Sequence, residues 1–318
     1  MKEAKVLVTG GAGFIGSHLV DILMNEGSSV KVIDNLGTGK YENVRSWLDN
    51  SRFEFVNADL KNPEASSENL HDAETVFHLA ANSEVRVGET EPTVHFAENL
   101  LATFNLLEAM RKNRRSRLLI FASSSTVYGE PHEIPTPEDY GPLLPISIYG
   151  ASKLGCESLI SSYCHTFDFT AVILRFANIV GSRATHGVIL DFIRKLQHNS
   201  KELEILGDGE QVKSYLHVRD LVRAFLAALR GVDRKRGVEI YNVGSSDQIK
   251  VKRIAEIVCQ EMAISKPSFR FNNPLKDGRG WKGDVKTMQL AIDKISRLGW
   301  QPSLNSEQAV QISCRELL

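Results

Sequence analysis

A tyrosine and a lysine stand four positions apart in the stretch Tyr149-Gly-Ala-Ser-Lys153. If this stretch is helical, the two side chains lie one turn apart on the same face. A free tyrosine has a pKa of about 10, and a positive charge held beside it favours the phenolate. Such a phenol can act as an acid or a base near neutral pH, so the pair is a candidate for proton transfer. The pattern is common in proteins, so its interpretation depends on the serine cluster and the glycine-rich turn that precede it in the sequence.

Three serines, Ser123 to Ser125, follow the apolar run Leu118–Ala122, which is predicted to be a strand. Hydroxyl groups at the end of a buried strand can hold a substrate oxygen by hydrogen bonds. Serines also end strands and cap turns without taking part in any chemistry. Their position before Tyr149 and Lys153 favours the interpretation as a substrate site.

A glycine-rich turn near the N-terminus predicts a dinucleotide site. The apolar run Val6–Val8 leads into glycines at positions 10, 11, 13 and 16, and Phe14–Met24 has helical periodicity. Backbone amides at such a strand–turn–helix junction can bind a pyrophosphate, and glycines permit the tight turn. A second apolar run, Val30–Asp34, ends in a carboxylate at about the spacing expected for binding ribose hydroxyls. A carboxylate there repels a 2′-phosphate, so the predicted cofactor is NAD.

Strand-like and helix-like runs alternate through the first half of the chain. The predicted strands continue with Arg52–Asn57, Thr75–Ala80, Leu118–Ala122 and Thr170–Leu174, and the predicted helices with Thr93–Lys112 and Ser152–Thr166. This alternation predicts an α/β fold, a Rossmann-type doubly wound parallel sheet whose ligands bind at the carboxyl ends of the strands.

The regular alternation weakens after about residue 176. We expect residues 1–176 to form the NAD-binding domain, with part of 215–245 returning to it, and residues 177–318 to form a smaller, irregular, mixed α/β domain. Within these segments we expect a helix at His217–Leu229, a strand at Glu239–Val243 and a loop over Pro267–Gly283.

Composition bounds the remaining possibilities. The 318 residues carry a formal net charge of −1 with both signs spread throughout, which gives no electrostatic footprint for nucleic acid or an anionic membrane. The four cysteines show no metal-type spacing, and no signal peptide or long apolar run stands out. We expect a cytoplasmic protein without a metal site, a nucleic-acid partner or a membrane partner.

Taken in order, the motifs resemble a known family. They are Gly10-x-x-Gly13-x-x-Gly16, Asp34-Asn35, Asp59-Leu60, His78-Leu-Ala-Ala81, Ser123–Gly129, Tyr149-x-x-x-Lys153 and Leu174-Arg-Phe-Ala-Asn178. Together they resemble the extended short-chain dehydrogenase/reductases, in the branch of UDP-glucose 4-epimerases and related nucleotide-sugar enzymes. The resemblance covers nearly the whole chain, and it makes residues 177–318 the expected nucleotide-sugar-binding domain.

The resemblance implies a role for each catalytic candidate. Tyr149 would take the proton from the sugar 4-hydroxyl while the 4-hydrogen leaves as hydride to NAD, and Ser124 would hydrogen-bond the same oxygen. Lys153 would bind the nicotinamide ribose and lower the pKa of Tyr149. In an epimerase the 4-keto intermediate then turns over and the hydride returns to its other face, so that NAD is regenerated without leaving the protein.

The resemblance also implies two sets of binding residues and a UDP-sugar as the substrate. The expected cofactor-binding residues are Gly10, Gly13, Phe14, Ile15, Gly16, Asp34, Asn35, Asp59, Leu60, Leu79, Ala80, Ala81, Asn99, Ser123, Tyr149, Lys153 and Phe176. The expected substrate-binding residues are Asn82, Ser124, Tyr149, Asn178, Val188, Gln211, Lys213, Tyr215 and Arg279. A homodimer is implied as well, through helices over Asn99–Lys112 and Tyr149–Thr166.

Positions 125 and 126 discriminate within the family. The 4,6-dehydratases carry an Asp-Glu pair there and the UDP-glucuronate decarboxylases usually carry a glutamate, whereas this chain has Ser125 and Thr126, which cannot supply a strong acid. Epimerisation of UDP-glucose and UDP-galactose is therefore the favoured function. A dehydratase, decarboxylase or dehydrogenase of the same family remains an alternative, and so does a non-catalytic NAD-binding regulator.

The chain also departs from the family at its phosphate-binding positions. Lys213-Ser214 replaces the usual Arg-Asp, and lysine keeps the charge without the bidentate fork of arginine. Trp281 occupies the place of a second arginine, whose phosphate contact the nearby Arg279 is a candidate to replace. By the same resemblance, Met288 stands where side-chain bulk would limit the access of N-acetylated sugars. The sequence leaves open glucose, an N-acetylhexosamine or a uronate.

Overall fold

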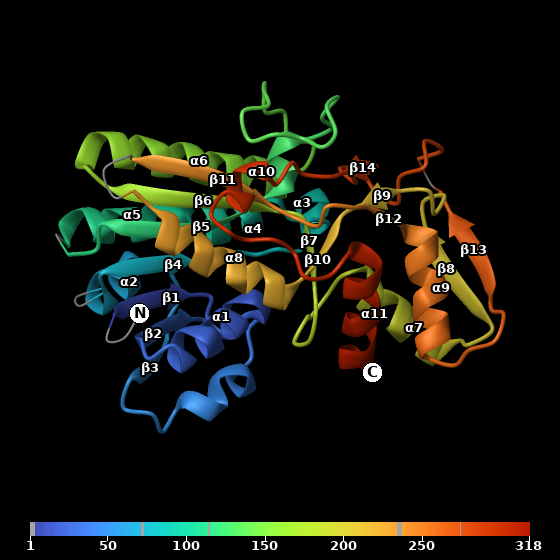
Figure 1. Cartoon of the computed structure of the whole chain (residues 1–318), viewed down its shortest axis with the longest axis horizontal. Coiled ribbons are helices and arrows are strands. Elements are labelled where there is room, and N and C mark those ends of the chain that lie inside the picture. The colour runs from blue at the N-terminus through green and yellow to red at the C-terminus, as the bar shows by residue number, and fades with distance from the viewer. Residues whose placement is uncertain (1–3, 71–72, 114, 234–236, 274) are drawn as a thin grey trace. The chain divides into compact units, whose positions relative to one another are not determined.

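A computed structural model describes residues 4–70, 73–113, 115–233, 237–273 and 275–318 (Figure 1). The chain divides into two compact units. The first comprises residues 1–123, 151–175 and 225–241, and the second comprises residues 124–150, 176–224 and 242–318. The predicted boundary at residue 176 falls where the chain passes between units, and residues 225–241 belong to the first unit. The assignment of one unit to NAD and the other to the nucleotide-sugar stays a prediction.

The first unit is built on one sheet. Within the described ranges its seven strands lie in the order β11-β6-β5-β4-β1-β2-β3, and the pairs β1–β2, β2–β3, β1–β4 and β4–β5 are parallel. The strands are β1 (Lys5–Thr9), β2 (Ser29–Asp34), β3 (Phe53–Asn57), β4 (Thr75–His78), β5 (Leu118–Ser124), β6 (Thr170–Phe176) and β11 (Val238–Val243). The chain moves outward from β1 to β3 and then returns to place β4 on the other side of β1. This reversal is the point at which doubly wound sheets bind their ligands.

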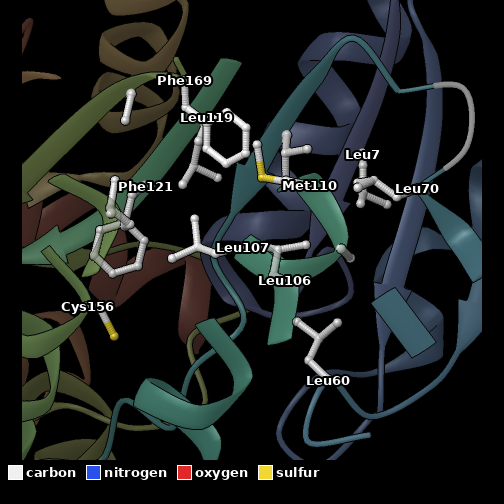
Figure 2. Close-up of a cluster of buried hydrophobic side chains, with 14 of the residues drawn as sticks. Leu7, Leu60, Leu70, Leu106, Leu107, Met110, Leu119, Phe121, Cys156 and Phe169 are labelled. Carbon is white, nitrogen blue, oxygen red and sulfur yellow. The ribbon is translucent and has the colours of Figure 1, made fainter. Parts of the chain in front are cut away.

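Side chains on one face of the sheet pack under helices α5 (Ala102–Lys112) and α6 (Ile148–Phe167). Figure 2 shows this core, in which Leu7 of β1, Leu119 and Phe121 of β5, and Cys156 of α6 lie together with Leu106, Leu107 and Met110 of α5. Alternate residues of the strands turn to the other face, where the ring of Phe77 lies 6.2 Å from that of Phe225. Because both faces are covered, the strands read as continuous apolar runs.

The first unit contains the following helical segments, of which α6 and α8 also include residues of the second unit. They are α1 (Phe14–Asn25), η1 (Tyr41–Trp47, 3₁₀), α2 (Pro63–Asn69), α3 (Val87–Thr90), α4 (Pro92–His95), η2 (Phe96–Leu101, π), α5 (Ala102–Lys112), α6 (Ile148–Phe167) and α8 (Val218–Gly231). The predicted single helix over Thr93–Lys112 is thus one continuous rod with a π-helical middle. Such π segments are rare and frequently lie at functional sites.

The second unit contains short sheets beside a helical core. Its elements are η3 (Ser125–Tyr128, 3₁₀), β7 (Asn178–Val180), α7 (Val188–His198), β8 (Glu202–Leu206), β9 (Val212–Lys213), β10 (Tyr215–His217), β12 (Ile249–Lys250), α9 (Val251–Glu261), β13 (Ser268–Asn272), β14 (Thr287–Met288), α10 (Asp293–Ser296) and α11 (Ser306–Leu317). Helices α7, α9 and α11 pack together around buried Phe192, Ile254 and Val310. Pairs β7–β10 and β8–β13 are parallel.

Two expectations for the C-terminal part are wrong. The segment Pro267–Gly283 is not loop throughout, because Ser268–Asn272 forms β13 and pairs with β8 in register over five residues; Pro274 lies outside the described residues. This part of the chain is also not irregular, since α7, α9 and α11 form a continuous apolar core. The strands and helices predicted in the first half are confirmed to within a few residues at their ends.

Candidate active site

The glycine turn between β1 and α1 is closely packed at three of its positions, among them Gly11, where a Cβ would lie 2.7 Å from the Val32 side chain. Gly10 has φ +70°, and a Cβ there would lie 2.7 Å from the amide nitrogen of Ala80. A Cβ on Gly16 would lie 2.0 Å from the carbonyl oxygen of Gly10. At Gly13, which caps α1, a Cβ would meet only that same carbonyl, at 3.2 Å. The turn therefore requires glycine for its own packing, and its open side at the N-terminus of α1 suits a pyrophosphate.

Asp34 closes the end of β2 beside this turn. Its Oδ2 accepts a hydrogen bond from the Ala12 N–H at 2.9 Å, and its Oδ1 accepts one from the Leu36 N–H at 2.8 Å. Burial raises the pKa of Asp34, and backbone N–H groups, including that of Gly13, oppose the shift only in part. A carboxylate has about four acceptor positions, so with three of them used by the N–H groups of Ala12, Gly13 and Leu36, Asp34 keeps capacity for a ribose hydroxyl.

Asn35 and Asp59 lie together at the ends of β2 and β3. The Asn35 amide donates to Asp59 Oδ2 at 3.1 Å, and the Lys61 N–H donates to Asp59 Oδ1 at 2.9 Å. Partial burial acts to raise the pKa of Asp59, but these hydrogen bonds and the Lys61 charge outweigh it and lower the pKa. Two of the residues predicted to bind the cofactor are thus held in contact.

A buried hydrogen-bonded chain runs from β1 through β4 to α5. The Thr103 hydroxyl donates to the Asn99 carbonyl at 2.7 Å, so it accepts from His78 Nε2 at 2.9 Å. His78 Nδ1 then accepts from the Thr9 hydroxyl at 2.7 Å. Burial and the Lys153 charge lower the pKa of His78 to about 3. His78 is therefore a neutral link that fixes the chain leading into Leu79, Ala80 and Ala81.

The π-helical segment aims Asn99 at the same strand end. Asn99 Oδ1 accepts from the Asn82 N–H at 2.8 Å, and its amide donates to the Ser152 hydroxyl at 2.9 Å. The Asn82 amide in turn donates to Glu98 Oε2 at 3.1 Å. Asn82, which was predicted to bind substrate, and Asn99, which was predicted to bind cofactor, are neighbours; their roles toward a ligand stay predictions.

Lys153 is buried on α6 with its amine at the end of β5. Its Nζ donates to the Ala122 carbonyl at 2.9 Å and lies 4.9 Å from the centre of the Phe121 ring. Burial lowers the pKa of Lys153 to about 8, while the negative charges of Cys156 and Glu157, when ionised, act in the opposite direction. A lysine in this state is poised to hold a ligand hydroxyl and to respond to a nearby charge.

Ser124 and Tyr149 lie on two segments that touch within the second unit. A Cβ on Gly150, next to Tyr149, would lie 2.7 Å from the Thr126 carbonyl oxygen, so the glycine allows the start of α6 to approach η3. Ser124 Oγ accepts from both the N–H and the hydroxyl of Thr126, at 3.2 and 3.0 Å. With its acceptor positions occupied, the Ser124 hydroxyl is oriented to donate.

The predicted phosphate-binding residues gather around Asp284, which the structure buries. Lys213 Nζ lies 2.5 Å from Asp284 Oδ1 and 5.6 Å from the centre of the Trp281 ring. The Gln211 amide donates to Asp284 Oδ2 at 3.5 Å, and Arg279 Nε donates to the Asp284 carbonyl at 3.0 Å. The guanidinium of Arg279 also pairs with Glu130 and Asp277. Asp284 thus connects three of the predicted substrate residues.

The remaining predicted substrate residues lie on neighbouring and separate elements. Asn178 and Tyr215 are register partners in β7 and β10, and the Asn178 amide donates to the Ser214 carbonyl at 3.2 Å. Val188 begins α7 and packs against the helical core. Phe176 ends β6 and is half-buried.

Reasoning from the sequence missed four residues that the structure ties to this chemistry. Asp284 and Glu157 were not named as candidates, Thr126 was noted only for lacking a carboxylate, and Arg175 appeared only as part of the motif Leu174-Arg-Phe-Ala-Asn178. Their positions in the sequence carry little signal. Each residue contacts a predicted site residue, either directly or, for Arg175, through Glu157. Among the described residues, no group of three or more His, Cys, Asp or Glu side chains is placed to hold a metal ion. In those same ranges, no helix has the length and apolarity needed to cross a membrane.

Comparison with known proteins agrees with this geometry. Residues 6–244 match the NAD dependent epimerase/dehydratase family. The chain is 30% identical over 313 residues to the UDP-glucose 4-epimerase of Corynebacterium glutamicum, covering 94% of this chain and 91% of that protein. A solved structure of a UDP-galactose 4-epimerase is 44% identical, covers 98% of both chains and superposes with a TM-score of 0.88.

A third similar protein acts on a different sugar. The UDP-glucuronic acid 4-epimerase of Bacillus cereus, solved with UDP-glucuronic acid and NAD, is 30% identical with a TM-score of 0.87 and 98% coverage of both chains. The fold and family are therefore shared by enzymes with different hexoses. From its glycine turn, its Asp34 carboxylate and these similarities, the chain belongs to the NAD dependent epimerase/dehydratase family, and its cofactor is NAD.

Proposed function

We propose that this protein interconverts UDP-glucose and UDP-galactose by epimerisation at C4. The observation that carries the proposal is the η3 turn: Thr126 donates twice to Ser124, and no carboxylate stands at positions 125 and 126. Elimination of water needs an acid at this point. A site with hydroxyl donors alone can take a proton from a sugar hydroxyl and return it.

Tyr149 and Ser124 have complementary roles in this reaction. Tyr149, as phenolate, accepts the proton of the sugar 4-hydroxyl, and the Ser124 hydroxyl donates a hydrogen bond to the same oxygen. Bound NAD, held by Asp34, Lys153 and the glycine turn, would supply the hydride acceptor and donor that oxidation and reduction at C4 require. On the return, Tyr149 gives the proton back to O4, so atoms and electrons balance over one cycle and the protein is unchanged.

Lys153 supports this proton transfer from within the first unit. Its ammonium favours the phenolate of a tyrosine one turn earlier on α6, and its buried amine is available to the nicotinamide ribose. With Asp34 and the glycine turn, it forms the proposed cofactor-holding set. The residues present fit NAD, because Asp34 offers an acceptor, Lys153 a donor and the glycine turn a bare backbone.

Lys213 and Arg279 are proposed to bind the diphosphate of the substrate. Both are cations already held by carboxylates, Lys213 by Asp284 and Arg279 by Glu130 and Asp277. A diphosphate is a stronger anion than a carboxylate, so the two cations can exchange or share partners when it binds. This replaces the arginine pair of the family with one lysine and one loop arginine.

Three further proposals concern the sugar, the assembly and the location of the protein. Met288 is buried in β14 and is flexible, so an N-acetylhexosamine or a uronate is the second candidate for the substrate. Phe96 and Phe104, 59% and 41% exposed on the rod that contains α5, are apolar side chains that a homodimer would cover. The four cysteines are buried free thiols, which fits a cytoplasmic location.

The deciding experiment is incubation of the purified protein with UDP-galactose or UDP-glucose without added NAD, followed by chromatography of the sugars. Interconversion without net NADH absorbance supports epimerisation. Stoichiometric NADH, or a 4-keto-6-deoxy product, would contradict it. The same assay with UDP-glucuronic acid and UDP-N-acetylglucosamine ranks the alternative substrates, and light scattering reports the oligomeric state.

A further inference from the structure

Glu157 and Arg175 form a buried ion pair for which the proposed chemistry has no direct use. Their side chains are only 5% and 4% exposed. Arg175 Nη2 donates to Glu157 Oε2 at 2.6 Å, and Arg175 Nε donates to both carboxylate oxygens at 3.0 and 3.1 Å. A buried pair costs desolvation that its attraction repays only in good geometry, so a function other than stability is a reasonable expectation.

The pair ties the end of β5 to helix α6. The Ser123 hydroxyl donates to Glu157 Oε1 at 2.5 Å, while Lys153 donates to the carbonyl of the preceding residue, Ala122, at 2.9 Å. Two successive residues of the strand are thus held by two side chains that stand one turn apart on α6. Arg175, from the adjacent strand β6, fixes the carboxylate from the far side.

The arrangement also sets the charge around Lys153. Glu157 brings one negative charge to the buried amine, and Arg175 cancels that charge beyond it. Removing Glu157 alone would leave an arginine as an uncompensated cation in the same buried region. Removing both would leave the net charge of the region unchanged, and it would abolish the link to Ser123 together with the negative charge beside Lys153.

We propose that Glu157, with Arg175 as its counter-ion, is a positioning residue that holds Lys153 at the end of β5 for its contact with the cofactor. The inference rests on the proposed function in one respect, because it takes Lys153 as a cofactor-holding residue. Neither residue of the pair is proposed to contact the sugar or the cofactor. It acts by fixing the helix that carries Lys153 against the strand that ends in Ser124.

The test compares the double variant Glu157→Met/Arg175→Met with wild type. Replacing a buried pair with apolar side chains of similar volume is often neutral or stabilising, so the fold is expected to persist in thermal unfolding. We expect the dissociation constant for NAD, measured by calorimetry, to rise and kcat to fall, each by about 10- to 100-fold. KM for the UDP-sugar should remain within about twofold. Unchanged NAD affinity and kcat in a folded double variant would overturn the proposal.

Two single variants keep the test decisive if the double variant does not fold. Ser123→Ala removes the link to Glu157 at the end of β5, and Ser116→Ala removes a buried hydroxyl that donates to the Ala73 carbonyl at 2.5 Å just before that strand. We expect similar losses of stability but a lower kcat and a shifted pH profile only for Ser123→Ala. Equal kinetics in the two variants would contradict the proposal.

The NAD titration separates the two levels of inference. It needs no sugar, so weaker NAD binding in the double variant supports the positioning role even if wild type epimerises no UDP-hexose. Conversely, an active wild type with unaffected variants leaves the proposed function standing and removes the positioning role. Arg175→Lys keeps the positive charge and loses the bidentate fork of the guanidinium. Its kcat should therefore lie between that of wild type and that of the double variant.

Discussion

The two units hold their polar side chains in different ways. In the first, Lys153, Glu157, Arg175 and His78 are buried and directed at strand ends. In the second, Arg279 lies on a loop with its partners Glu130 and Asp277, whose side chains are 42% and 36% exposed. Lys213 is intermediate, since its partner Asp284 is buried while the lysine itself keeps some exposure.

This difference separates a fixed site from an exchangeable one. The end of a parallel sheet fixes groups whose partners cannot leave, which suits a cofactor that stays bound through each cycle. Ion pairs at a surface are worth little, so a substrate anion can replace them at small cost. The similar proteins include a UDP-glucose 4-epimerase and a UDP-glucuronic acid 4-epimerase, which fits the proposed assignment of the first unit to the cofactor and of the second to the sugar nucleotide.

The largest effect is expected from Tyr149→Phe. The ring keeps its packing in a position that is only 8% exposed, whereas the proton acceptor is lost. We expect kcat to fall by about 10²- to 10⁴-fold with the NAD content of the purified protein unchanged. Epimerisation rates and cofactor extraction would measure this, and near-normal turnover would remove Tyr149 from the reaction.

The fixed half is tested next by Asp34→Asn, which keeps the shape and removes the charge. The preference for NAD over NADP should fall by about 10- to 100-fold, since one charge no longer repels the 2′-phosphate. Titration with both cofactors measures the ratio. An unchanged ratio would mean that the loop after β2, and not the carboxylate, selects NAD.

The exchangeable half is tested by Arg279→Met, with Arg270→Met as the matched control. We expect KM for the UDP-sugar to rise about tenfold with kcat and the melting temperature nearly unchanged, because the lost ion pairs are partly exposed. Arg270 also pairs with two glutamates at the surface, Glu202 and Glu204, and is 58% exposed. Its variant should leave KM unaltered; equal effects would indicate a general loss of positive charge.

The smallest effect is the pH dependence that Lys153 contributes. Because its pKa is lowered to about 8, the cation is present below that pH, and kcat should decline about twofold by pH 8 and further above it. The unfolded chain keeps the proton up to its ordinary pKa of 10.5. The Lys153 contribution to the free energy of unfolding therefore increases with pH between these values. Both trends are isolated by measuring kcat and the free energy of unfolding against pH for wild type and for Lys153→Met. Parallel profiles for the two proteins would contradict the predicted contribution of Lys153.

Much of the first unit was predictable because its signals are local. The strand, glycine turn and helix at Val6–Met24 follow from periodicity and from glycine alone, and Asp34 follows from its place at the next strand end. The π-helical middle of the rod was not predictable, since its pattern is that of an ordinary helix. Strand β13 was missed, although Phe269 and Phe271 alternate with polar residues, because its partner, β8, is far away in sequence.

The sequence by itself determined the cofactor turn, the spacing of Tyr149 and Lys153, and the family, because these depend on residue type and on spacings of a few positions. Only the tertiary structure decided which groups hold those residues. Glu157 meets Ser123 across 34 positions, and Lys213 meets Asp284 across 71. Such pairings depend on where the chain returns after folding, and burial then fixes the charge and direction of each side chain.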